Sequence, residues 1–116
     1  MIERKLEKII EGQLFKGKAI VLVGPRQVGK TTLLSELVRH SDQRVLSLNC
    51  DEPEVQAMLN NTNVAKLSAM IGNSKLVVID EAQKVDNIGL TLKLIVDNFK
   101  EVQVVATGSS AFELRN

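Results

Sequence analysis

The sequence has 116 residues, 44% of them apolar, which suits one compact domain spanning 1–116 and leaves little room for a second core. Its 15 Lys and Arg balance 14 Asp and Glu, so the net charge gives no electrostatic field strong enough to predict a nucleic-acid or membrane partner. The sequence has no Trp or Tyr, which argues against an aromatic platform for stacking single-stranded bases. The single cysteine excludes an internal disulfide framework and favours a cytoplasmic setting, and no apolar run reaches the ~18 residues of a membrane span or forms a signal peptide.

The N-terminal part of the chain predicts two helices and two strands. Apolar residues at helical spacing indicate a short amphipathic helix over 2–12. The unbroken apolar run 19–23 is typical of a strand buried on both faces of a parallel sheet. Residues 31–40 then carry apolar side chains on one face of a helix, and 44–48 form a second predicted strand.

Two short helices are predicted after the second strand. Pro53 suits a first helical position, and the spacing of Val55, Met58 and Leu59 predicts that all three face inward. A further short helix is expected over 62–71. The second of these helices is expected to end near Gly72.

The C-terminal part predicts two more strands. Residues 76–79 form the third, a helix of clear period follows over 86–99, and 102–106 form the fourth. Residues 110–113 resemble a capping box that opens another helix. Strands alternating with helices in this rhythm predict a parallel α/β sheet with right-handed crossovers.

The strongest motif is the loop Gly24-Pro25-Arg26-Gln27-Val28-Gly29-Lys30-Thr31, which matches the phosphate-loop pattern G-x-x-x-x-G-K-[ST], or Walker A. Glycines let the backbone N–H groups wrap phosphate oxygens, and the following helix presents its positive end. Lys30 is predicted to reach the β- and γ-phosphates, Thr31 to bind Mg²⁺, and Thr32 to add a phosphate contact. Arg26 either contacts nucleotide or partner, or is solvated. The alternative for the whole segment is an ordinary glycine-containing turn before a helix.

An acidic pair, Asp80 and Glu81, follows the third strand at the edge where ligands bind in open α/β folds, as a Walker B motif does. Asp80 is predicted to hold Mg²⁺ through water, and Glu81 to polarise an attacking water. The alternative is a helix N-cap with favourable charge at the dipole.

Hydroxyl groups end the fourth strand at the same edge. Thr107 or Ser109 could hydrogen-bond the γ-phosphate or the attacking water as a sensor, although a turn and N-cap explain the segment equally well. Gln83 could contact the site or cap its helix, and Asp51 is similarly ambiguous. Cys50 is predicted to serve packing.

Taken together, the segments 24–34, 78–84 and 105–110 resemble the AAA-type P-loop ATPases of bacteria and archaea, and the resemblance runs from about Leu14 to Leu114. It implies an ASCE-type, three-layer P-loop NTPase fold with strand order 2-3-4-1, Asp80 on Mg²⁺, Glu81 as the catalytic carboxylate and a sensor after strand four. In complete members a fifth strand, a lid and a C-terminal partner domain follow; we expect this chain to stop before them. Strand 19–23 would then be an edge strand that favours self-association.

The expected function is Mg-ATP binding and hydrolysis coupled to a conformational change in a partner domain. The alternative from another class is a nucleotide-dependent switch or docking module that binds ATP with little hydrolysis. A P-loop kinase ranks lower, because kinases have no need for Glu81 beside Asp80. A helicase is disfavoured by chain length, and a GTPase by the absence of an N-K-x-D segment.

Overall fold

The computed structural model describes residues 19–23, 35, 36, 38, 39 and 43–108. Four predicted features fall wholly or mostly outside these residues: the N-terminal helix, the phosphate loop, Ser109 and the 110–113 capping box. Of the predicted helix 31–40, the four described residues are helical: Ser35, Glu36, Val38 and Arg39.

Four parallel strands form one sheet in the order β1-β4-β3-β2. They are β1 (Ile20–Val23), β2 (Val45–Asn49), β3 (Leu76–Asp80) and β4 (Gln103–Gly108). The predicted order 2-3-4-1 is therefore confirmed. β4 runs two residues past the predicted end, because Thr107 pairs with Leu22 and Gly108 with Val23 of β1.

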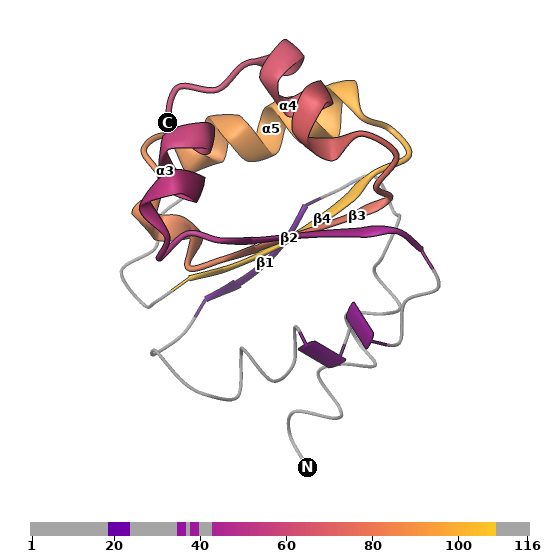
Figure 1. Cartoon of the computed structure of the whole chain (residues 1–116), viewed down its shortest axis with the longest axis horizontal. Coiled ribbons are helices and arrows are strands. Elements are labelled where there is room, and N and C mark those ends of the chain that lie inside the picture. The colour runs from indigo at the N-terminus through magenta and orange to yellow at the C-terminus, as the bar shows by residue number, and fades with distance from the viewer. Residues whose placement is uncertain (1–18, 24–34, 37, 40–42, 109–116) are drawn as a thin grey trace.

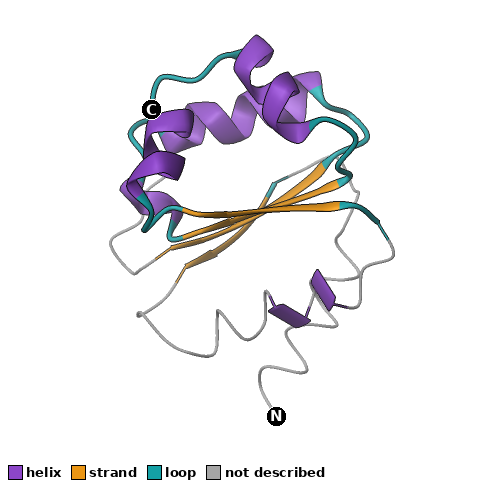
Figure 2. Cartoon of the chain, in the orientation of Figure 1, coloured by secondary structure: helices purple, strands orange, loops and turns teal. Residues whose placement is uncertain are grey.

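Helices cover both faces of this sheet (Figure 1). On one face lie α3 (Pro53–Leu59), α4 (Val64–Ile71) and α5 (Ile88–Asn98). The helical residues 35, 36, 38 and 39 lie on the other side of the sheet, where Val38 packs against the buried cluster of Leu76, Val78 and Val105. Figure 2 shows the same three layers by element type. A 3-10 turn, η1 (Ala82–Lys84), was not predicted, because three residues are too short to show a period.

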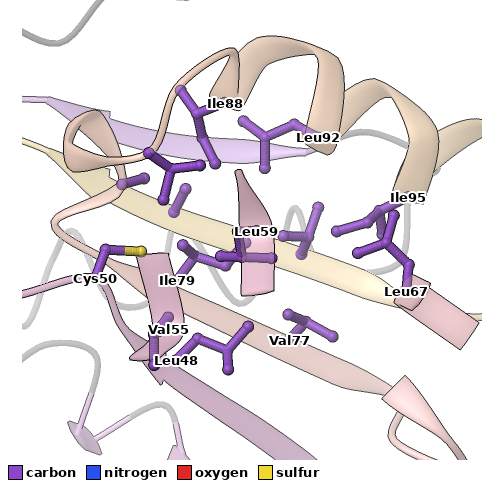
Figure 3. Packing of buried hydrophobic residues seen from close by; sticks show 14 of the residues in the cluster. Leu48, Cys50, Val55, Leu59, Leu67, Val77, Ile79, Ile88, Leu92 and Ile95 are labelled. Carbon is purple, nitrogen blue, oxygen red and sulfur yellow. The ribbon is translucent and has the colours of Figure 1, made fainter. Parts of the chain in front are cut away.

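The main core lies between the sheet and the three helices (Figure 3). Ile79 of β3 and Leu59 of α3 are fully buried, and Ile88, Leu92 and Ile95 line the inner face of α5 at helical spacing. β3 and β4 run through the centre of the sheet, and the first four residues of β3 and all of β4 are buried. Their apolar, β-branched composition is what a strand covered on both faces requires.

Met58 corrects the prediction for α3. Val55 and Leu59 are buried as expected, but Met58 is 42% exposed. The helix has seven residues, and the two positions four apart already form its inward stripe. The Met58 side chain therefore projects off that stripe toward solvent.

Both ends of the second short helix have local stop signals, and its C-terminal end lies beside Gly72 as predicted. The Asn63 side chain caps the N-terminus of α4 by accepting a hydrogen bond from the Lys66 N–H at 2.9 Å. Gly72 follows the last residue with φ +53°, a backbone conformation that glycine adopts without steric cost.

Neighbouring residues of α3 give a matched test of the core. Leu59→Ala should lower the free energy of unfolding by about 2–5 kcal/mol, because it leaves a cavity at a fully buried position. Met58→Ala should change it by less than about 1 kcal/mol. Chemical denaturation monitored by circular dichroism measures both; an equal loss in the two variants would contradict this packing of α3.

Candidate functional site

The carboxyl ends of the four strands gather at one edge of the sheet, because all four are parallel. β3 ends at Asp80, and Thr107 and Gly108 end β4 beside it. β1 ends at Val23, immediately before the predicted phosphate loop. The topology therefore brings the start of that loop, the acidic pair and the end of β4 to a common edge, where open α/β folds bind ligands.

A single hydroxyl joins the two acidic residues. The fully buried Thr107 donates its O–H to Asp80 Oδ1, and its Oγ1 accepts a hydrogen bond from the Glu81 N–H at 3.2 Å. The register that pairs Ile79 with Ala106 makes this contact possible, because Asp80 and Thr107 are the next residues on the two strands. Thr107 thus touches one acidic residue through its side chain and the other through its backbone.

Glu81 occupies an unusual backbone conformation for a side-chain-bearing residue. Its φ of 55° and ψ of 46° lie in the left-handed region. The residue is 7% exposed, and its Oε1 accepts a hydrogen bond from Gln83 Nε2 at 2.8 Å. Residues held in such conformations cluster at functional sites, where the surrounding contacts keep them in place.

The end of β2 is fixed to the acidic segment by backbone and side-chain bonds. The Cys50 N–H donates to the Asp80 carbonyl at 2.9 Å, and Gln56 Nε2 donates to the Cys50 carbonyl at 2.7 Å. Asp51 forms a half-exposed ion pair with Lys84 at 2.8 Å. Asp51, left ambiguous by the sequence, therefore contacts the turn that follows Glu81.

A groove of about 660 Å³ opens beside Asp80. Ser47, Asn49 and Val78 line it on the sheet, and the helical residues Ser35, Val38 and Arg39 also line it. Asp80 is only partly buried and lines the groove at the end of β3. Among the described residues, the groove therefore extends from Asp80 along the β2 side of the sheet.

The sequence predictions for this edge have mixed outcomes. The structure brings Asp80, Glu81 and Thr107 together, and Cys50 is buried as predicted. Residues 24–32 and Ser109 lie outside the described residues, so their roles stay predictions. Sequence reasoning missed the hydroxyl bridge: the polar residue at the end of β4 was the signal, but its partner depends on the strand register.

The donor set at this edge suits Mg²⁺. The described residues hold no cluster of three or more His, Cys, Asp or Glu side chains that could form a metal cage. Mg²⁺ is usually bound by one or two carboxylates together with phosphate oxygens and water, which a single accessible Asp80 fits.

Residues 16–116 match the AAA domain family. The chain belongs to this family. The match covers the predicted phosphate loop, the acidic pair and the end of β4, so the sequence prediction of an AAA-type P-loop domain is confirmed.

Relatives of this AAA domain are longer proteins. An uncharacterized protein of Methanocaldococcus jannaschii is 30% identical over 125 residues, which cover 99% of this chain and 26% of that protein. The replication factor C large subunit of Methanosarcina acetivorans is 30% identical over 73 residues, or 61% of this chain and 12% of that protein. The chain therefore spans about a quarter or less of these relatives.

Solved structures share the fold. Bacteroides Pif1 bound to ssDNA matches with a TM-score of 0.60 at 21% identity, over 93% of this chain and 31% of that one. The Pif1 helicase from Candida albicans matches with a TM-score of 0.61 at 18% identity, over 93% and 32% of the two chains. Among the helices that the structure describes, none is long and apolar enough to cross a membrane.

Because of Cys50, the free energy of unfolding should depend on pH. Burial, with the Asp80, Asp51 and Glu81 charges nearby, raises the pKa of the thiol from its ordinary 9.0 to about 12. Above pH 9 the unfolded chain therefore loses a proton that the folded chain keeps, so the free energy of unfolding should fall as pH rises, by up to about 1.4 kcal/mol per pH unit.

The test compares wild type with Cys50→Ala in denaturant titrations at pH 8, 9 and 10. The chain has no tyrosine, so fewer other groups titrate in this window. The wild type should lose more stability than the variant between pH 9 and 10. Parallel slopes for the two proteins would contradict the environment described for Cys50.

Proposed function

We propose that this chain binds Mg-ATP and hydrolyses it, and that nucleotide state is passed to another part of a longer protein. The observation that carries the proposal is the joining of Asp80 and Glu81 by Thr107 at the edge where the predicted phosphate loop begins. Two acidic residues held in fixed relation beside a phosphate site are what metal binding and water activation need. Family membership and the shared fold support the same reading.

The residues divide the chemistry between them. Lys30 and the backbone of residues 24–31 would hold the phosphates, and Thr31 and Asp80 would hold Mg²⁺, whose charge stabilises the negative phosphate oxygens. Glu81 would orient water and take up its proton. Because Glu81 is nearly buried, its carboxylate would act in a site with little bulk water, where charges interact more strongly.

Coupling to a partner is inferred from length. The chain spans 26% of the Methanocaldococcus relative and 12% of the replication factor C subunit, so nucleotide-driven changes would act on domains outside this segment. In this sheet β1 pairs only with β4 among the described strands, and the predicted self-association through β1 belongs to the same proposal.

A second function, a switch that binds ATP with little hydrolysis, is favoured by one contact. Gln83 Nε2 donates to Glu81 Oε1 at 2.8 Å, and a carboxylate oxygen held by an amide is less available to take a proton from water. The two functions share a binding site and differ in whether Glu81 is used.

Nucleotide binding and hydrolysis can be separated by substitution. Lys30→Ala should abolish binding of a fluorescent ATP analogue in the presence of Mg²⁺. Glu81→Gln should keep binding and lower phosphate release by about 10²–10⁴-fold, because it removes the proton acceptor. Glu101→Gln is the matched control, since that carboxylate is exposed and paired with Lys75. Unchanged affinity in Lys30→Ala would contradict the proposed phosphate site.

Gln83 distinguishes the ATPase from the switch. For an ATPase, Gln83→Ala should lower phosphate release about tenfold, because one hydrogen bond that orients a charged group is worth about 1.5 kcal/mol. Gln56→Ala is the control, since that amide binds the Cys50 carbonyl instead. Steady-state phosphate release measures both variants. A rise in Gln83→Ala would show that the amide restrains Glu81 and would favour the switch.

A further inference from the structure

The sequence left open whether Thr107 or Ser109 acts as a sensor that hydrogen-bonds the γ-phosphate or the attacking water, or whether the segment is a turn and N-cap. In the structure its side chain is fully buried and already engaged on both sides. A threonine hydroxyl has one proton to donate, and here that proton goes to Asp80 Oδ1. The same proton cannot also be donated to a phosphate oxygen.

One of the two acceptor lone pairs of the hydroxyl is used as well. Thr107 Oγ1 accepts the Glu81 N–H at 3.2 Å, and this N–H belongs to the residue whose backbone turns into the left-handed region. A buried N–H without a partner is unfavourable, so the bond helps to hold that turn. Thr107 therefore fixes the direction of one acidic side chain and the backbone of the next residue.

We propose that Thr107 is a positioning residue: its hydroxyl orients the Asp80 carboxylate for Mg²⁺ and fixes the Glu81 backbone, without contacting the nucleotide. This inference rests on the proposed Mg-ATP site and adds the residue that holds the Asp80 carboxylate and the Glu81 backbone in place. Groups that orient a metal-binding side chain typically change metal affinity or activity by roughly 10–100-fold when removed.

The position in the sheet explains why a strand residue can do this. Thr107 is paired with Leu22 in β1 and lies next to β3, so its backbone is held from both sides. Because the side chain is also fully buried and hydrogen-bonded to Asp80 and Glu81, its hydroxyl has little room to rotate toward a ligand. A sensor, by contrast, must change partner with nucleotide state.

The test is a Mg²⁺ titration of nucleotide binding, which does not depend on turnover. Binding of a fluorescent ATP analogue to the 116-residue chain is measured as Mg²⁺ is raised, for wild type, Thr107→Ser and Thr107→Val. Valine has nearly the shape of threonine without its hydroxyl. The Mg²⁺ midpoint should rise by about tenfold or more in Thr107→Val, and it should stay near the wild-type value in Thr107→Ser, which keeps the hydroxyl.

A sensor role gives a different result. Thr107→Val would then slow phosphate release while leaving the Mg²⁺ midpoint unchanged, and that outcome overturns the inference. If the valine variant does not fold, Thr107→Cys replaces it, because a thiol is a weaker donor; an unchanged midpoint in the cysteine variant also overturns the inference.

Mg²⁺-dependent nucleotide binding by the wild type tests the proposed function separately from the role of Thr107. Mg²⁺-dependent binding by wild type with no shift in the valine variant removes the positioning role and leaves the Mg-ATP site standing. No Mg²⁺-dependent binding by wild type removes both. A shifted midpoint in Thr107→Val with a normal one in Thr107→Ser supports both.

Discussion

The parallel pairing of β3 with β4 is the constraint on which the site depends. Its register aligns Ile79 with Ala106, so that Asp80 and Thr107 meet at the ends of adjacent strands. A shift of one residue would turn Thr107 to the opposite face of the sheet and remove the hydroxyl from Asp80. The register is in turn held by the core, because Val77, Ile79, Val104 and Ala106 all pack under the same layer of helices. The geometry of the site therefore depends on the packing of the core.

Much of this fold could be predicted from sequence because its strands are unusually clear. The predicted strands 76–79 and 102–106 have no competing helical period; the first is buried in β3, and the second is buried in β4 from Gln103 onward. Met58 could not be placed correctly, since a short helix fits more than one inward face. The order of the strands followed from resemblance to a family, and periodicity alone would not have provided it.

The sequence indicated which residues form the site, but not which of them are hydrogen-bonded to one another. Motif spacing indicated that Asp80, Glu81 and Thr107 belong to one edge, because parallel strands end together. It could not show that Thr107 bonds Asp80 and the Glu81 backbone, or that Gln83 bonds the Glu81 carboxylate, because these contacts depend on strand register and on the left-handed turn at Glu81. Hydrogen-bond partners across strands are tertiary information that residue order does not contain.

The left-handed turn at Glu81 also bears on how this domain can change over evolutionary time. Glycine or asparagine would occupy that backbone conformation at lower steric cost, but neither carries a carboxylate. Selection for thermal robustness alone would therefore favour losing the glutamate, whereas under the proposed function selection for catalysis would favour keeping it, which is a local trade-off between stability and activity. A homologue that has glycine at this position, with the aspartate and threonine retained, would be expected to bind nucleotide as a non-hydrolysing descendant of the same fold.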